Sequence, residues 1–309
     1  MERAMKQTHA PQPQGTTGAA TGAGIRRFSS PRARRSMLHV VERLLVYGVL
    51  TFFAFLFLLP LISMLDTAFK PRALVYSFPP TWFSGDVTLD NFRFGWNALP
   101  FDRFLLNTLF VTSVSVCGTV LSSSLVGFGF ARYHARGAGL LFMVMLATLM
   151  IPPTTTLIPR FVLFAKLGWI NSYLPLLDPT FFGMPFFIFL FRQFFRSIPR
   201  DYFDAAEIDG CSPFGLYWRI ALPMARPALV TSALFATIGA WNDFLDPLIF
   251  LSTMDKFTLQ VGLATFNGAY YSQLHLLMPM ALVGIVPVLV VVVVGQRWIL
   301  SGLMRQVEK

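Results

Sequence analysis

The chain has 309 residues, of which 55% are hydrophobic and 13% are charged, whereas about 25% are charged in a typical soluble domain. This deficit, together with 33 Phe residues, excludes an ordinary soluble protein and predicts an all-α membrane protein with a lipid-facing surface. The net charge of +10 would suit a nucleic-acid-binding protein, but the basic residues stand beside hydrophobic stretches and no nucleic-acid motif is present. No nucleic-acid partner is therefore expected.

Residues 1–36 are rich in Pro, Gln, Gly, Thr and Arg and contain almost no large apolar side chains. Such a segment buries too little surface to fold, so a disordered tail is predicted before a membrane domain at 37–309. Within the tail, Arg26-Arg27-Phe28 resembles the core of a twin-arginine export signal. The apolar stretch that follows is too long for a signal peptide and lacks a cleavage pattern, so it is interpreted as a spanning helix.

Six apolar stretches follow the tail, each of about 20 residues, the length that crosses a hydrocarbon core of ~30 Å at ~1.5 Å per residue. They run approximately over 40–65, 105–130, 138–158, 174–195, 228–251 and 276–300. The second stretch is dense in small residues, which favour close packing between membrane helices. These residues are Ser113, Ser115, Gly118, Ser122, Ser123, Ser124, Gly127 and Gly129.

The positions of the 25 Lys and Arg residues predict how the helices are oriented. Most of them fall in the N-terminal tail, in the loops at 131–137 and 192–227, and at the C-terminus. Because cytoplasmic loops of membrane proteins carry an excess of basic residues, both termini and the 192–227 loop are expected in the cytoplasm.

Residues 199–223, which we call the elbow, have the pattern of two short helices joined by a turn. Pro199 suits a first helical turn, and Gly210 stands where a C-terminal cap needs a positive φ. Ser212-Pro213 provide an N-cap and a first helical residue for the second helix. Leu222-Pro223 are expected to end it, because the residue before a proline disfavours the α conformation.

The first helix of the elbow combines small and acidic side chains. Ala205 and Ala206 are small enough to let a helix sink into a groove on another protein, and Asp204 could pair with basic residues around that groove. An ordinary amphipathic connector is the alternative, and these residues by themselves leave both open.

The order of residues in the elbow resembles the E-A-A-x-x-x-G loop of bacterial ABC importer membrane subunits. The residues that carry the resemblance are Asp204, Ala205, Ala206, Asp209, Gly210, Ile220, Leu222 and Pro223. The chain has Asp204 where the family usually has Glu. Trp241-Asn242-Asp243-Phe244 is similar to the W-N-[DE]-F segment of the second membrane subunit of maltose-type carbohydrate importers, and the likeness covers most of 40–305.

The resemblance implies a permease subunit that imports a sugar or related polyol across a bacterial cell membrane. It implies four kinds of partner: the lipid bilayer, a second and different permease subunit, two ATP-binding subunits, and an extracytoplasmic substrate-binding protein. The elbow would dock into an ATP-binding subunit, and the outer loop at 252–276 would reach into the binding protein. ATP and Mg would be used by the partner ATPase subunits, with no cofactor in this chain.

Nothing in the sequence points to an enzyme. No G-x-x-x-x-G-K-[ST] motif is present, so ATP hydrolysis is not expected in this chain. The four histidines and two cysteines lack metal-ligand spacing, so neither a metal site nor a disulfide is expected. These residues are His9, His39, His134, His275, Cys117 and Cys211.

Two carboxylates near the outer end of the fifth stretch need an explanation, because charges within spans are costly and usually face protein or water. Asp243 and Asp246 are three residues apart and share one helix face. With Asn242 they are candidates for the lining of a translocation path, or they cap a helix broken at Pro247. An ion-coupled secondary transporter using Asp243 or Asp246, and a non-transporting scaffold, remain alternative functions.

Overall fold

The computed structural model describes residues 31–268 and 273–307, with side chains over 42–268 and 273–296. The chain forms two units, residues 1–58 and 59–309. Most of the predicted tail, including Arg26-Arg27-Phe28, lies outside the described residues. Its last six residues do not: helix α1 (Pro31–Phe69) begins at Pro31 rather than after residue 36. Proline is compatible with a first helical turn because the missing N–H has no partner there in any case.

Residues 44–58 of α1, which lie in the first unit, include no charged residue, and apolar side chains surround the helix there. Every side chain from 42 to 58 is exposed, including those of Leu50, Phe53 and Phe57. A helix with no polar face and no buried face fits lipid rather than water, as expected for the first predicted span.

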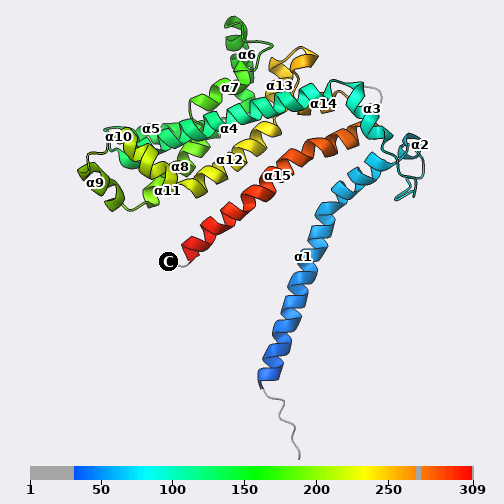
Figure 1. The fold of residues 1–309 in the computed structure, drawn as a ribbon, viewed down its shortest axis with the longest axis horizontal. Helices are drawn as coiled ribbons and strands as arrows, with labels where there is room; N and C mark the ends of the chain where they lie inside the picture. Colours follow the sequence, from blue (N-terminus) through cyan, green and yellow to red (C-terminus); the bar gives the residue numbers. More distant parts are fainter. Residues whose placement is uncertain (1–30, 269–272, 308–309) are drawn as a thin grey trace, which may run out of the picture. The chain divides into compact units, whose positions relative to one another are not determined.

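In the second unit the long helix α4 (Phe101–Arg132) is central. It packs against α8 (Pro185–Ser197), α7 (Leu174–Phe181) and α12 (Arg226–Trp241), and α12 packs in turn against α15 (Leu274–Val307) (Figure 1). This bundle anchors the elbow described below and supplies part of the wall of the cavity.

The small residues of α4 allow this close packing, as the sequence predicts. A Cβ atom added at Gly118 would lie 2.7 Å from Thr180 Oγ1, and one added at Gly127 would lie 2.7 Å from Phe191 Cβ. Gly129, in contrast, has no neighbouring atom within 4 Å of such a Cβ. Two of the eight small residues therefore set how closely α7 and α8 approach α4.

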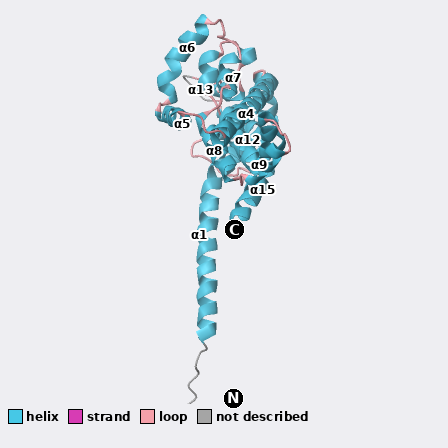
Figure 2. Cartoon of the chain, turned by 90° about the vertical axis from the view of Figure 1, so that its left-hand side faces the viewer, coloured by secondary structure: helices cyan, strands magenta, loops and turns pink. Residues whose placement is uncertain are grey.

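The described residues form helices joined by loops (Figure 2). Among them, four helical segments are long and apolar enough to cross a membrane, or up to six if each of two bent helix pairs counts as one span. The predicted all-α membrane fold is confirmed. Three of the six predicted spans are interrupted: 138–158, 174–195 between α7 and α8, and 228–251.

The third predicted span, 138–158, is not one straight helix. Helix α5 (Ala138–Ala147) continues as a 3-10 turn to Met150, and the chain resumes at Pro153 and leads into α6 (Leu157–Lys166) at 93° to the first part. Ile151 and Pro152 between them are extended, with ψ of 117° and 133°. Two successive prolines remove backbone donors and push the preceding residues out of the α region, so the helix breaks there.

The fifth predicted span, 228–251, is also interrupted. Helix α12 ends at Trp241, and a second helix, α13 (Leu245–Phe250), begins after a short break. The Nδ2 of Asn242 donates to the carbonyl of Ile238 (2.8 Å), and Trp241 Nε1 donates to the carbonyl of Gly284 in α15 (3.1 Å). At the end of α12, both side chains donate hydrogen bonds to backbone oxygens, which stabilises the end of the helix there. Because the surrounding residues are apolar, hydropathy alone shows no interruption at this point.

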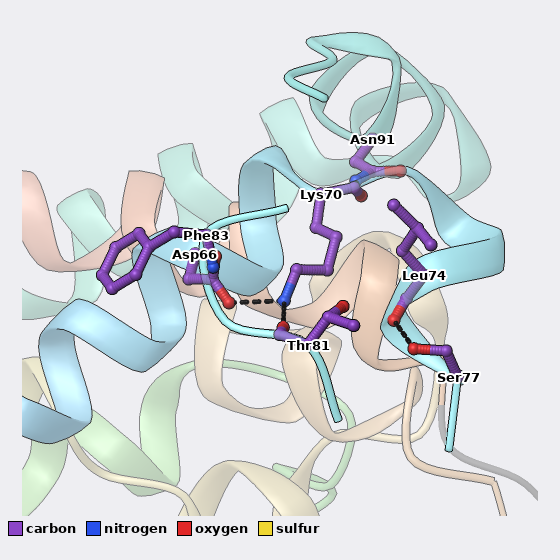
Figure 3. Close-up of polar contacts among 7 residues, drawn as sticks. All are labelled: Asp66, Lys70, Leu74, Ser77, Thr81, Phe83 and Asn91. Atoms are coloured by element: carbon purple, nitrogen blue, oxygen red, sulfur yellow. Dashed lines mark hydrogen bonds and ion pairs between the residues drawn. The ribbon is translucent and has the colours of Figure 1, made fainter. Parts of the chain in front are cut away.

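The connection from α1 to α3 (Asp90–Ala98) is folded back by a buried charge (Figure 3). The side chain of Lys70 is 7% exposed; its Nζ binds Asp66 Oδ2 at 2.5 Å and also donates to the carbonyl of Thr81. Asn91 donates to the carbonyls of Ala68 (3.0 Å) and Lys70 (2.8 Å). A buried lysine is tolerated because its charge is paired. The short helices α2 (Arg72–Val75) and α14 (Leu259–Ala264) lie in the connections between the longer helices.

Candidate coupling elbow and polar cavity

The first half of the elbow forms as its capping residues predict. Helix α9 (Asp201–Ile208) is followed by Gly210, whose φ is +79°, a left-handed conformation that favours glycine. Ser212 Oγ then accepts a hydrogen bond from the backbone N–H of Gly215 (3.2 Å) and caps α10 (Pro213–Gly215).

The second half differs from the prediction at its end. A π-helical turn (Leu216–Ala221) leads into α11 (Leu222–Met224), and Leu222 stays helical with φ of −64° and ψ of −45°. The Leu222 N–H bonds to the carbonyl of Tyr217, five residues back, and Pro223 then stands at the start of α11, where a missing N–H is tolerated. The chain turns by 79° between Met224 and α12 instead. The prediction that Leu222-Pro223 end the helix is therefore wrong.

Aromatic side chains anchor the elbow to the helix bundle. Phe203 of α9 and Tyr217 of the π turn are both 3% exposed, and both pack against Phe128 of α4, with ring centroids 6.0 and 5.6 Å away. The Tyr217 hydroxyl also hydrogen-bonds to Ser124 Oγ (2.8 Å). The elbow is thus part of the core at this end of the bundle, and motion of α9 is mechanically linked to α4.

An ion pair adds a second link between α9 and α4. Nη2 of Arg132, in the last turn of α4, donates to Asp204 Oδ1 (2.7 Å) and Glu207 Oε1 (3.1 Å). The guanidinium also lies 5.3 Å from the centre of the Phe203 ring. The sequence suggested that Asp204 could pair with basic residues of another protein; in the structure it binds Arg132 of the same chain. No local pattern could reveal this pair, because its members are 72 residues apart.

The other predicted coupling residues divide into two groups. Ala206, Ile220 and Leu222 are partly buried against the core that contains Phe203 and Tyr217. Those that are exposed are Ala205, Asp209, Gly210 and Pro223.

The elbow also exposes large apolar side chains. Ile208 is 86% exposed, Phe214 63% and Trp218 53%, and the rings of Phe214 and Trp218 stack with centroids 6.3 Å apart. Exposed apolar groups at this density on a polar connector are typical of an interaction surface.

A largely apolar cavity of about 720 Å³ that contains a few charged and hydroxyl groups lies farther along the bundle, between α4, α6, α7, α12 and α13. Asp243 and Asp246 both line it, whereas Asn242 is not among the lining residues. The other charged lining residues are Arg160 and Asp178, and Ser115 and Thr119 of α4 add hydroxyl groups.

The charged residues of the cavity are held in place by one another. Arg160 binds Asp246 with two hydrogen bonds, Nη2 to Oδ2 at 2.7 Å and Nη1 to Oδ1 at 3.3 Å, and both side chains are 25% exposed. Asp243 Oδ1 accepts from the backbone N–H of Asp246 (3.4 Å) at the start of α13. The helix is not broken at Pro247, which lies inside α13. The break falls earlier, between Trp241 and Leu245. Asp243 therefore caps α13 and lines the cavity at once.

The loop that follows α13 is hydrogen-bonded to the first turns of α4. Asn107 Nδ2 donates to the carbonyls of Asp255 (2.9 Å) and Phe257 (3.0 Å), and Thr108 Oγ1 accepts from the backbone N–H of Leu259 (2.7 Å). Residues 269–272 lie outside the described residues. That the loop at 252–276 reaches into a binding protein stays a prediction.

Comparison with known proteins identifies the family. Residues 123–300 match the family described as "Binding-protein-dependent transport system inner membrane component". The chain is 32% identical to the arabinooligosaccharides transport system permease protein AraQ of Halalkalibacterium halodurans, over 87% of this chain and 97% of that protein. It is also 32% identical to the sulfoquinovosyl glycerol transport system permease protein SmoH of Agrobacterium fabrum, over 92% of this chain and 96% of that protein.

A solved structure has the same fold. A chain in the crystal structure of a bacterial ABC transporter that imports the acidic polysaccharide alginate aligns with a TM-score of 0.73 and 24% identity, over 87% of this chain and 98% of that one. The helical membrane fold and these matches define a multi-pass permease of a transport system. The chain belongs to the family of binding-protein-dependent transport system inner membrane components, which confirms the resemblance seen in the elbow.

Proposed function

We propose that this chain is a permease subunit of an ATP-binding-cassette importer for a sugar or related polyol. Relatives that match nearly the whole chain are named as permeases for arabinooligosaccharides and sulfoquinovosyl glycerol. The chain would assemble with a second, different permease subunit, two ATP-binding subunits and an extracytoplasmic binding protein. ATP and Mg would be bound and used by the ATP-binding subunits, and both termini would lie in the cytoplasm.

The observation that carries this proposal is the two-sided construction of the elbow. Its inner side is fixed to α4 by Phe203, Tyr217 and the Arg132–Asp204 ion pair. It also exposes the apolar side chains of Ile208 and Trp218. An ATP-binding subunit that grips these side chains would move α4 with the elbow.

Movement of α4 would reach the cavity directly, because the same helix that ends at Arg132 lines the cavity through Ser115 and Thr119. Asp243 and Asp246 of the cavity wall are acceptors, and Arg160 is a donor, so the wall offers hydrogen bonds that can replace water around sugar hydroxyl groups. In this mechanism, nucleotide-driven movement of the elbow changes access to the cavity, and the sugar passes the charged and hydroxyl groups set in its largely apolar wall.

Exposed elbow residues provide the test of docking. Ile208→Asp and Ala205→Trp should each reduce co-purification of the ATP-binding subunit and abolish sugar uptake, while the chain still reaches the membrane. Ala206 is a poorer target because it packs against the core, so a bulky residue there would disturb folding. Val87→Asp is the matched control, since Val87 is 76% exposed and far from the elbow in sequence. Normal assembly and uptake in both elbow variants would refute the proposal.

The competing function is ion-coupled secondary transport, with Asp243 or Asp246 as the coupling carboxylate. Asp246 is already bound by Arg160, which favours a structural role for its charge. The isolated chain in liposomes distinguishes the two functions: gradient-driven uptake without ATP would establish secondary transport, and uptake only with ATP-binding subunits would establish the importer. A non-transporting scaffold would show no substrate-stimulated ATPase activity in the reconstituted complex.

A further inference from the structure

A small basic pocket lies where the elbow joins the helix bundle. It has a volume of about 150 Å³ and is formed by the ends of α4 and α8, the residues that follow each of them, and the first turn of α9. Arg132, Arg196, Arg200 and His134 line it, together with aromatic rings that include Phe203. None of these arginines lines the cavity at Asp243.

Two of the three arginines of the pocket have no ion-pair partner within the described part of the chain. Arg196 and Arg200 make no ion pair there, and no acidic side chain is among the lining residues. Arg132 binds Asp204 and Glu207 through one nitrogen, Nη2, and its Nη1 and Nε make no hydrogen bond to a described residue. Three guanidinium groups therefore retain donors at one concave site.

We propose that this pocket binds a phosphate group, supplied either by the headgroup of an anionic phospholipid or by a free phosphate ion. The planar, permanently charged guanidinium donates paired hydrogen bonds that match phosphate oxygens. The volume of about 150 Å³ holds one such group and is too small for an oligosaccharide. The cation–π contact with Phe203 orients Arg132 without occupying its remaining donors.

The position of the pocket favours the lipid as the source. α4 and α8 both end at it, and both belong to segments long and apolar enough to span a membrane, so the pocket lies beyond the apolar part of these spans, on the side where headgroups are found. Basic pockets between membrane helices at the cytoplasmic side are suited to anionic headgroups. A bound phosphate would join the C-terminal ends of α4 and α8 to Arg200 at the start of α9, and would thereby hold the elbow against the bundle.

Binding can be measured on the full-length chain in detergent, without any transport assay, so the result is independent of the proposed function. Native mass spectrometry with added phosphatidylglycerol counts bound lipid, and a titration with inorganic phosphate measures the second source by thermal shift. We expect the Arg196→Gln/Arg200→Gln variant to bind at least about tenfold more weakly, since two charge-assisted contacts are removed. Arg219→Gln/Arg226→Gln is the matched control, because these exposed arginines lie outside the pocket.

The two titrations identify the source of the phosphate group. Retained phosphatidylglycerol that inorganic phosphate does not displace identifies a lipid site, and saturable binding of inorganic phosphate identifies an ion site. Hydrogen exchange at 201–210 should slow when the pocket is filled in the native chain, and not in the Arg196/Arg200 variant. Equal binding by that variant and the native chain, an equal loss in the control, or no binding of either compound would overturn the proposal.

Discussion

Arg132 and Asp204 join the end of a membrane helix to the elbow. Their side chains are 2.7 Å apart, and the guanidinium is only 17% exposed while the carboxylate is 56% exposed. The pair therefore lies at the boundary between the core and solvent, where a partner protein that binds the outer face of α9 would act on it directly.

Arg132→Gln should uncouple the elbow with little loss of stability. Because Asp204 is more than half exposed, the ion pair contributes about 0.2–1 kcal/mol to folding. Its loss should weaken coupling by more, about 0.5–2 kcal/mol, the range for mutations between linked sites. The measurement is the amount of substrate moved per ATP hydrolysed by the reconstituted importer. Arg136→Gln, an exposed arginine four residues away, is the control, and an unchanged ratio in Arg132→Gln would contradict the prediction.

Breaking the Arg160–Asp246 pair on one side should destabilise the second unit. Asp246→Asn leaves the Arg160 charge without its carboxylate partner at a site only 25% exposed, and should cost about 1–3 kcal/mol. Thermal unfolding in detergent measures the loss. The double variant Arg160→Met/Asp246→Leu removes both charges and should recover most of the stability. If the double variant is no more stable than Asp246→Asn, the unpaired Arg160 charge is not the cause of the lost stability.

Gly127→Ala tests the contact between α4 and α8. The added methyl group would lie 2.7 Å from Phe191 Cβ and 3.1 Å from the backbone nitrogen of Arg192, so the helices must separate, at a cost of about 1–3 kcal/mol. Gly129→Ala, two residues away with open space at its Cβ, should be neutral or slightly stabilising because alanine favours helix. Equal stabilities of the two variants would show that α8 does not rest on Gly127.

Thr108→Val tests the link between α4 and the outer loop. The buried Thr108 hydroxyl donates to the carbonyl of Phe104 (2.9 Å) and accepts from the N–H of Leu259 (2.7 Å). Valine has a similar shape but leaves the Leu259 N–H unpaired, which should cost about 1–3 kcal/mol. Thr108→Ser keeps the hydroxyl group and should therefore be more stable than the valine variant. Hydrogen exchange of the Leu259 amide should be faster in the valine variant and unchanged in the serine variant. If this amide is as well protected in the valine variant as in the native chain, the hydrogen bond between Leu259 and Thr108 does not protect it.

Features that depend on residues close together in the chain could be predicted from the sequence. Composition and hydropathy are sufficient for a helical membrane fold, because each span must satisfy its own backbone hydrogen bonds in lipid. Gly210 and Ser212 were correctly assigned as caps because capping acts over three or four residues. The order in which acidic residues, alanines and a glycine follow one another in the elbow was enough to indicate the family.

Contacts between segments that are far apart in the sequence became known only from the folded structure. The break after Trp241 involves a bond to Gly284, and the π turn before Pro223 lets a helix continue where a local rule ends it. The ion pairs of Arg132 with Asp204 and of Arg160 with Asp246 join residues 72 and 86 positions apart. A charge in a loop has no assigned partner until packing brings one within hydrogen-bond distance, so the anchoring of the elbow, the wall of the cavity and the basic pocket were all beyond a reading of local pattern.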